Sequence, residues 1–537
     1  MSLTTSTNAE HRPLPTSPTG RSESGRSTSR SLGVLSAAIP LLIAATFVTY
    51  ELTRPHQLFG VFAADDGVYY GMADRLVHGV IPYRDFAIVH PPGIALLLAP
   101  VAAIGRAVGS RDGLAIARLI TAIVAVANVG LVCWILRYRG AFASFVGGLV
   151  LAGFPITIAA THTVLLEPYV VLFVLTSVAF CFTNGVPSSR DARLLAAGAA
   201  AGFACAIKID AAIVLVVLIA VVATRSIAGA TRVALGAGIV IVASCGPFAA
   251  LAPGAFFRDV VVAQLARGAT ARATPGIGVR LLDLTGLKGV TAFAVSPTSA
   301  EVIGAIVGAG IAVYVVTSLR HFDQMTLFSL AALVATTLIE LFTPAFYTYY
   351  SYLPTALFAI AAGLVAGSLV PRGISWATAI AVVLTIGAGA FVIDQQATFV
   401  NSYIASDPAS DIGAVVDAAV PSGACVVFDE AVLAIASNRF DPSRARCPEI
   451  DDPFGSWLAA DPSHPPPSLS PPESLVRQWR SWLARANYFL ESAPRSAFVP
   501  WTPALFRYFE HAYRLVSSTR RAFVYENKRR AGARATP

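Results

Sequence analysis

Two adjacent carboxylates, Asp65 and Asp66, open the densest cluster of polar residues in the sequence. The other members of the cluster are Tyr69, Tyr70, Tyr83, Arg84, Asp85 and His90. A carboxylate in an apolar setting can take a proton as a general base, and a neighbouring cation can hold an anionic group. The cluster follows the first long apolar segment, and charged groups near lipid are costly and tend to be functional. A structural alternative stays open, because Asp65 could instead cap the helix expected from Asp66 to His78.

The composition is that of a membrane protein. Of the 537 residues, 55% are hydrophobic and only 13% are charged, and the mean hydropathy is +0.66. Soluble domains carry about 25% charged residues, and an apolar run of about 20 residues can cross a bilayer as a helix. The sequence therefore predicts an all-α polytopic membrane protein. It excludes a soluble multidomain enzyme, a nucleic-acid-binding protein and a disordered scaffold.

Eleven apolar segments are expected to cross the membrane. They are residues 32–51, 114–136, 141–160, 166–183, 193–207, 209–224, 233–251, 299–319, 324–343, 348–368 and 374–394. The short loops between them place their arginines on one side, which indicates the cytoplasmic side. The N-terminus, with a disordered tail over residues 1–31, is then cytoplasmic, and the C-terminus is extracytoplasmic. The net charge of +8 fits this topology.

Three segments are then long enough to carry function outside the membrane. Residues 53–113 contain an apolar stretch at 93–104 that is too short to span, so we expect surface helices there. The loop over 252–298 is basic, and its cationic residues are Arg258, Arg267, Arg272, Arg280 and Lys288. An Arg in this loop could bind phosphate. Arg280 is chosen for its position near the next span, although a solvated surface is the alternative.

Residues 395–537 are expected to form a small extracytoplasmic α/β domain. Its expected elements are strands at 424–428, 497–500 and 521–525 and a helix at 430–437. Cys425 and Cys447 could form a disulfide, which requires an oxidising compartment. Four tryptophans are expected to pack in its core rather than to bind a ligand, namely Trp457, Trp479, Trp482 and Trp501.

Taken in order, these motifs resemble those of the GT-C membrane glycosyltransferases, in particular the protein-mannosyltransferase and aminoarabinose-transferase-like branch. The shared pattern is an acidic pair after the first span, then x-x-Tyr, a Gly-to-Tyr turn and a His/Lys-Pro-Pro helix start. Here it reads Asp65-Asp66, Tyr69, Gly79 to Tyr83, and His90-Pro91-Pro92. Further matches within residues 30–395 are Arg118, His162, Glu167-Pro168, Lys208 and the Tyr349–Pro354 motif. The layout around Cys425 and Cys447 resembles the C-terminal domains of actinobacterial members. The second acid is Asp where Glu is usual, and His90 stands where aminoarabinose transferases carry Lys.

The resemblance implies an inverting glycosyltransferase that uses a polyprenyl-phosphate sugar at the outer face of the plasma membrane. An acceptor hydroxyl displaces the lipid phosphate, which needs a base for the proton and cations for the phosphate. Asp65 is the implied base. The implied donor- and acceptor-binding residues are Asp66, Tyr83, His90, Glu167, Lys208 and Arg280. Alternatives remain, because Lys208 could snorkel or pair with Asp210, His90 could cap a helix, and Glu167 could serve helix packing.

The expected partners are a polyprenyl-phosphate sugar donor, a glycan, glycolipid or protein acceptor of the cell envelope, and membrane lipids. No nucleic acid and no cofactor are expected. The acidic pair could hold a divalent ion, but no Cys/His ligand spacing supports a metal site. The expected location is a bacterial plasma membrane. A lipid-linked-sugar flippase or transporter and a non-catalytic envelope-assembly scaffold are the alternative functions.

Overall fold

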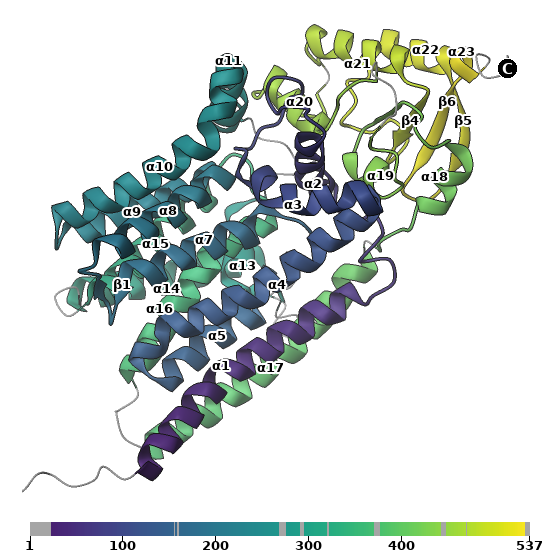
Figure 1. The fold of residues 1–537 in the computed structure, drawn as a ribbon. Coiled ribbons are helices and arrows are strands. Elements are labelled where there is room, and N and C mark those ends of the chain that lie inside the picture. The colour runs from purple at the N-terminus through teal and green to yellow at the C-terminus, as the bar shows by residue number, and fades with distance from the viewer. Residues whose placement is uncertain are drawn as a thin grey trace, which may run out of the picture.

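The computed structural model describes residues 23–154, 156–157, 160–267, 275–289, 295–318, 322–369, 376–406, 408–441, 447–468 and 470–531. Residues 1–22 of the expected tail, and Arg272, lie outside these ranges. Figure 1 shows a bundle of long helices packed side by side, with a smaller domain of helices and strands seated on one end. The expected order, a helical membrane part followed by a small α/β part, is confirmed.

Each expected span coincides with one helix of the bundle. These helices are α1 (Glu23–Leu52), α4 (Ser110–Leu136), α5 (Ala141–Gly153), α7 (Leu166–Cys181), α8 (Asp191–Ile207), α9 (Ala212–Ala223), α10 (Ile227–Leu251), α14 (Pro297–Ser318), α15 (Gln324–Phe342), α16 (Tyr352–Leu369) and α17 (Trp376–Ser406). Within the described ranges, 5 helices are long and apolar enough to cross a membrane by length and composition. They are Leu35–Leu52, Ser110–Arg139, Ile227–Leu251, Gln324–Phe342 and Thr348–Ser368. The total of eleven crossings stays a prediction.

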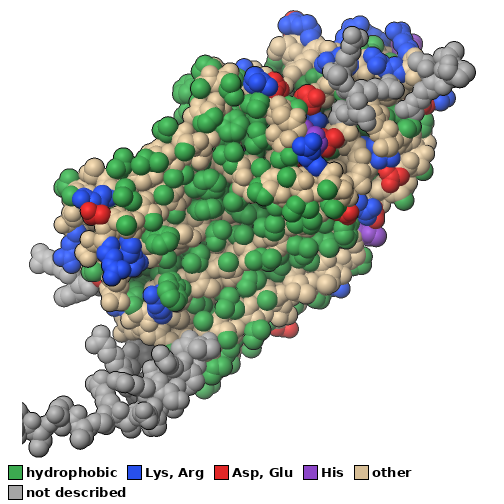
Figure 2. Space-filling view, in the orientation of Figure 1, with side chains coloured by type: hydrophobic (Ala, Val, Ile, Leu, Met, Phe, Trp, Pro, Cys, Tyr) green, Lys and Arg blue, Asp and Glu red, His purple; other side chains and the backbone are tan. Residues whose placement is uncertain are grey.

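A broad hydrophobic surface runs across the bundle, and charged side chains gather at its two ends (Figure 2). Large apolar side chains of these helices are exposed, and Leu42, Ile123 and Val242 are 67%, 67% and 69% exposed. Exposed apolar area of this extent is unfavourable in water but matches lipid tails, where the helices satisfy their backbone hydrogen bonds internally. The chain is therefore a multi-pass membrane protein.

Helices α1 and α17 run along each other at one edge of the bundle (Figure 1). Phe47 and Val400 are buried between them, and the Tyr50 hydroxyl donates a hydrogen bond of 2.6 Å to Asn401 Oδ1. Helix α1 begins at Glu23 and therefore includes part of the segment expected to be a disordered tail. Extending an existing helix adds a hydrogen bond for each residue ordered, without a new nucleation cost.

Two shorter helices, α2 (Ala64–Val77) and α3 (Gly93–Val108), pack against each other at the end of the bundle that carries the α/β domain (Figure 1). Helix α3 is the stretch expected not to span, and it has only 16 residues. A Cβ at Gly93 would collide with the carbonyl oxygen of Ala206. Glycine at this position therefore lets the start of α3 pack tightly on the end of α8, which brings His90 close to Lys208.

The loop that follows α10 is also largely helical. It contains α11 (Pro253–Phe257), a π-helical turn at Arg258–Val262, α12 (Ala263–Leu265) and α13 (Ile277–Thr285). A π-helical turn is rare and is often found at functional sites. Here it is followed by Arg267, which enters the cavity described below.

The C-terminal domain contains a four-stranded sheet of order β3-β4-β6-β5. The strands are β3 (Val426–Phe428), β4 (Tyr488–Glu491), β5 (Tyr513–Ser518) and β6 (Phe523–Asn527), and β3–β4 is the parallel pair. Its helices are α18 (Gly413–Ala419), α19 (Ala431–Ile435), α20 (Pro453–Ala460), α21 (Glu473–Arg485), α22 (Pro503–Ala512) and the short α23 (Lys528–Ala531). The strands expected near β3 and β6 are confirmed.

The strand expected at 497–500 was wrong, because this segment forms turns, and β4 and β5 were missed. Strand β4 is buried on both faces, so it lacks the alternation that marks a half-buried strand. Trp457, Trp479 and Trp482 are buried, as expected for core residues. Trp501 is partly buried, and its ring lies 5.2 Å from that of Phe509.

Candidate active site

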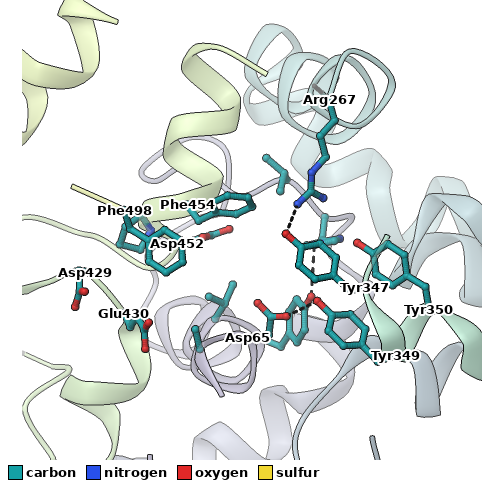
Figure 3. Close-up of a pocket in the computed structure, with 16 residues that line it drawn as sticks. Asp65, Arg267, Tyr347, Tyr349, Tyr350, Asp429, Glu430, Asp452, Phe454 and Phe498 are labelled. Carbon is teal, nitrogen blue, oxygen red and sulfur yellow. Dashed lines mark hydrogen bonds between the residues drawn. The ribbon is translucent and has the colours of Figure 1, made fainter. Parts of the chain in front are cut away.

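A cavity of about 150 Å³ lies where α2, the loop after α12, the turn before α16 and the C-terminal domain meet (Figure 3). Its lining residues are Ala64, Asp65, Val68, Tyr69, Val89, His90, Arg267, Tyr347, Tyr349, Tyr350, Asp429, Glu430, Asp452, Pro453, Phe454 and Phe498. We call it the Asp65 cavity. Asp65 lies between a tyrosine-rich wall with Arg267 on one side and an acidic, phenylalanine-containing wall on the other (Figure 3).

Asp65 lies in the first turn of α2 and faces the cavity. Its Oδ2 accepts a hydrogen bond of 2.7 Å from the Tyr349 hydroxyl. Burial raises the pKa of Asp65, although Tyr349 and the charge of Arg267 act in the opposite direction. The alternative role as helix cap does not hold, because Ala63 is the N-cap residue of α2 and has no side-chain cap. The geometry leaves Asp65 as a carboxylate that can accept a proton from a molecule in the cavity.

Asp66 points away from the cavity into a buried ion pair. Its Oδ2 accepts hydrogen bonds from Arg118 Nε and Nη2, at 2.9 and 2.6 Å, and from Thr163 Oγ1 at 3.1 Å. Both charged side chains are fully buried. Arg118 Nη1 also donates to backbone carbonyls of Gln57, Leu58 and Gly60. Asp66 therefore anchors the start of α2 to α4 through a protein cation, and the expected contact with a sugar stays a prediction.

A second cavity, of about 270 Å³, adjoins the first and shares three lining residues with it. The shared residues are His90, Arg267 and Tyr350, and the other members include Lys208, Asp210, Leu265, Ile339 and Glu340. We call it the Lys208 cavity. The two cavities together connect Asp65 to a cation and an apolar wall at the end of the membrane helices.

Lys208, at the end of α8, carries two acidic neighbours. Its Nζ lies 3.0 Å from Glu167 Oε1 and 2.9 Å from Asp210 Oδ2, and it lies 3.6 Å from the centre of the Tyr350 ring. The pairing with Asp210, given above as an alternative to phosphate binding, is present. Glu167 lines neither cavity, but it contacts Lys208, which lines the second one. The Nδ1 of His162 lies 3.5 Å from Glu51 Oε2.

His90 lines both cavities. Burial, together with the charges of Lys208 and Arg267, lowers the pKa of His90 to about 3, so its imidazole is neutral at physiological pH. The Tyr69 hydroxyl lies 3.5 Å from its Nε2. A neutral imidazole can donate one hydrogen bond to a phosphate or sugar oxygen but adds no charge.

Tyr83 and Arg280 line neither cavity and act on the backbone instead. The Tyr83 hydroxyl donates to the carbonyl oxygen of His90 at 2.5 Å. Arg280 is buried, and its Nη1 donates to carbonyl oxygens at the end of α15, those of Glu340, Leu341 and Thr343 at 3.0, 3.1 and 2.7 Å. A direct contact of Arg280 with phosphate stays a prediction. Arg280 holds the last turn of α15, which leads into the tyrosines of the Asp65 cavity.

Arg267 is the cation that both cavities share, and sequence reasoning did not single it out. Its Nη2 donates to the Tyr347 hydroxyl at 3.2 Å, and its guanidinium lies 5.3 Å from the Phe454 ring centre. Among the described residues, no carboxylate lies within 4.0 Å of this guanidinium. Its only signal in the sequence was membership of a basic loop with several other cations.

Three carboxylates of the Asp65 cavity come from the C-terminal domain: Asp429, Glu430 and Asp452. Burial raises the pKa of Asp452 to about 7 and that of Glu430 to about 8. Asp452 begins α20 as its N-cap, with Oδ1 accepting from the Gly455 amide at 2.7 Å and Pro453 at the first helical position. The sequence analysis did not place these residues in the site, because no local sequence pattern indicates which loops of the C-terminal domain pack against α2.

The segment from Cys447 to Asp452, which leads to the cavity, is fixed by contacts with α2 and by a disulfide. Arg75 of α2 is buried, donates to the carbonyl oxygen of Ile450 at 3.0 Å and lies 2.8 Å from Glu449 Oε2. The sulfur atoms of Cys425 and Cys447 lie 2.09 Å apart, as in a disulfide. A cluster of Asp74, His78 and Asp441 also lies beside Arg75, outside the cavity.

We expect the disulfide to contribute about 3 kcal/mol to the stability of the C-terminal domain, since it closes a loop with a sequence separation of 22. A Cys425→Ser/Cys447→Ser variant should lower the thermal unfolding temperature of the purified protein. A Cys205→Ser variant, which removes a cysteine of the membrane part, serves as control. An unchanged unfolding temperature in the double variant would contradict the prediction.

Comparison with known proteins gives a fold and no family. No protein-family model and no curated protein matches the sequence. ArnT from Cupriavidus metallidurans bound to undecaprenyl phosphate superposes with a TM-score of 0.57 at 15% identity, covering 94% of this chain and 98% of that chain. The archaeal oligosaccharyltransferase AglB from Archaeoglobus fulgidus, in complex with an inhibitory peptide and a dolichol-phosphate, gives 0.50 at 12% identity, covering 94% and 75%. At such identities the likeness establishes a shared fold, and the expected GT-C-like fold is confirmed.

Proposed function

We propose that this chain is a membrane glycosyltransferase that moves a sugar from a polyprenyl-phosphate donor to an acceptor hydroxyl with inversion. The observation that carries the proposal is the pair of adjoining cavities, in which a carboxylate with a raised pKa faces one and cations beside apolar side chains line the other. The ligands of the structures that share the fold support it, since ArnT holds undecaprenyl phosphate and AglB holds a dolichol-phosphate.

The donor phosphate is assigned to the boundary between the two cavities. Arg267 supplies the main charge, because no described carboxylate lies within 4.0 Å of its guanidinium. Lys208 adds a cation that Glu167 and Asp210 already flank. His90 offers a neutral hydrogen-bond donor. Leu265 and Ile339 form part of an apolar wall that suits the start of a prenyl chain. Arg binds phosphate well because its fork can donate two parallel hydrogen bonds.

The sugar then lies between the phosphate and Asp65. The acceptor oxygen attacks the anomeric carbon while Asp65 removes its proton, and the bond from that carbon to the phosphate oxygen breaks. The bonding electrons leave with the phosphate, whose developing charge Arg267 and Lys208 stabilise. The products are a glycosylated acceptor, free polyprenyl phosphate and a protonated Asp65. Attack on the face opposite the phosphate gives inversion.

The proposal places the cavities outside the cell. Residues 32–394 form the membrane domain with a cytoplasmic N-terminus, and residues 395–537 form an extracytoplasmic domain. The arginines of the short loops support this orientation, and a disulfide between Cys425 and Cys447 suits an oxidising compartment. A C-terminal alkaline phosphatase fusion should be active in cells, and an inactive, stably expressed fusion would reverse the orientation. The actinobacterial character and the exact branch stay part of the proposal.

The function is tested by sugar transfer in membranes that contain the expressed protein, with a panel of radiolabelled polyprenyl-phosphate sugars. We expect the labelled sugar of one donor to be transferred to an acceptor, with release of polyprenyl phosphate. Movement of the intact labelled donor across vesicles without transfer would instead identify a flippase. If no donor is consumed or moved, the scaffold alternative gains support.

We expect Arg267→Gln to lower kcat by about 100-fold, the usual loss when one donor to a developing oxyanion is removed. Arg267→Lys should recover part of the rate, since it restores the charge but not the two-pronged hydrogen bonding. Arg84→Gln is the matched control, because Arg84 is exposed and pairs with Asp85 away from both cavities. Equal rates for Arg267→Gln and the control would remove Arg267 from the mechanism.

A further inference from the structure

The C-terminal wall of the Asp65 cavity differs in chemistry from the wall that faces the membrane helices. Figure 3 shows Asp429, Glu430, Asp452, Phe454 and Phe498 on one side of Asp65, opposite the tyrosines and Arg267. Carboxyl groups accept hydrogen bonds through their oxygens, and a protonated one also donates a single hydrogen bond, so this wall suits a ligand that carries several hydroxyl groups. Because the donor phosphate needs cations, it belongs on the opposite side, and the acidic wall is left for the acceptor.

The two phenylalanines add an apolar face to this wall. The rings of Phe454 and Phe498 lie 5.6 Å apart in an edge-to-face arrangement. Phe454 follows Asp452 by two residues in the first turn of α20, so both side chains are placed by the same helix start. A sugar ring matches this combination, since its hydroxyls donate at the ring edge and its C–H groups present an apolar face. An extended peptide backbone offers one N–H group per residue and no apolar ring face, so it matches this wall less well.

Charge excludes a further class of acceptor. Asp65 lies on the same cavity as the three carboxylates of the C-terminal domain. Arg267 also lines this cavity, with its guanidinium 5.3 Å from the Phe454 ring centre. A phosphate, sulfate or carboxylate on the acceptor, placed against this wall, would be repelled by those carboxyl groups that are ionised, in a poorly solvated space where repulsion is strong. Conversely, hydroxyls that donate to Asp452 and Glu430 supply hydrogen bonds to buried carboxylates, whose pKa values burial raises.

We propose that the acceptor is a neutral carbohydrate, whose terminal sugar ring binds between Asp452, Glu430 and Phe454 of the C-terminal domain with one hydroxyl directed at Asp65. This inference rests on the proposed function and names the acceptor class. Asp429 is a positioning residue, because its carboxylate accepts from the Ser492 amide at 2.9 and 3.1 Å and from the Ser492 hydroxyl at 2.5 Å. Arg75 and the Cys425–Cys447 bridge keep the 447–454 segment over the cavity.

The test uses the full-length protein in nanodiscs and the polyprenyl-phosphate sugar that the wild type consumes. The acceptor probes are methyl α-D-mannopyranoside, methyl α-D-glucopyranoside and methyl α-D-arabinofuranoside, the 6-phosphate of the first, and an acetylated threonine peptide amide. We expect transfer to at least one neutral glycoside, at least tenfold slower transfer to the phosphorylated one, and none to the peptide. Saturation-transfer NMR with the same glycosides, without donor, reports binding independently of activity.

Asp452→Asn is the decisive variant, because Asn also caps helices and should preserve α20. We expect it to raise KM for the glycoside about tenfold, as for the loss of a hydrogen bond to a charged group, and to narrow the discrimination against the 6-phosphate. Phe454→Ala should raise the same KM and weaken the NMR signal. Asp461→Asn is the matched control in the same domain, since Asp461 pairs with His464 outside the cavity.

Failure of this inference differs from failure of the proposed function. Transfer to the peptide or to the phosphorylated glycoside in preference to every neutral glycoside would overturn the inference and leave the glycosyltransferase function standing. An unchanged KM in both Asp452→Asn and Phe454→Ala would also overturn it. If the wild type neither consumes a donor nor binds a glycoside, the proposed function and the inference fail together.

Discussion

Replacing Asp65 by Asn should lower kcat for sugar transfer by about 1,000-fold, within the range usual for loss of a general base, while the protein keeps its fold. Asn has the same shape and can still contact the Tyr349 hydroxyl, which now donates at 2.7 Å to Asp65 Oδ2. It cannot take the acceptor proton. Initial rates at saturating donor, compared at equal amounts of folded protein, measure the effect.

The pH profile of the wild type should identify the same group. A base works only when it is deprotonated, so kcat falls as the pH drops through the pKa of Asp65, which burial raises above the ordinary carboxyl range. The hydrogen bond from Tyr349 lowers that pKa. Tyr349→Phe should therefore move the acidic limb to still higher pH, and the residual activity of Asp65→Asn should lack this limb.

Asp112→Asn is the matched control for Asp65→Asn, because Asp112 is an exposed acid in the first turn of α4 and lines neither cavity. It should leave kcat and the acidic limb unchanged. Wild-type rates in Asp65→Asn would exclude the carboxylate as base. A limb that stays in place in Tyr349→Phe would assign it to another group.

The bundle could be predicted from the sequence because membrane helices are selected by local properties. Apolar length and loop arginines are read one segment at a time, and each expected span coincides with a helix. The C-terminal sheet was predicted less well, since β4 and β5 depend on pairing with distant strands. Strand β4, for example, pairs with β3, although α19, α20 and α21 lie between the two strands in the sequence.

The site could be predicted only where neighbours in the sequence decide it. The acidic pair was found, but adjacent residues on a helix point about 100° apart, so Asp65 and Asp66 reach different surroundings. Nothing local states which of them faces the cavity. Arg267 and Arg280 are both arginines of the basic loop, and no local sequence pattern distinguishes them. Only the tertiary structure directs Arg267 to the cavities and Arg280 to carbonyl groups.

Asp66 should behave in the opposite way to its neighbour, with a large effect on stability. Asp66 and Arg118 are both fully buried in the native protein. Asp66→Asn therefore leaves the Arg118 guanidinium buried without a countercharge. Removing one partner of such a pair typically costs about 3–5 kcal/mol. We expect a clear fall in the thermal unfolding temperature and a low yield of folded protein.

The activity of the surviving Asp66→Asn protein separates the two acids. The molecules that fold should transfer sugar with a kcat within a few-fold of the wild type, because Asp66 lines neither cavity. An Asp66→Asn/Arg118→Met variant should regain part of the lost stability, since an apolar replacement of both members removes the unpaired charge. Normal unfolding of Asp66→Asn combined with a lost kcat would instead place Asp66 in contact with the substrate. Together, the expected results would assign proton transfer to Asp65, which faces the cavity, and the anchoring of α2 to Asp66, which faces Arg118.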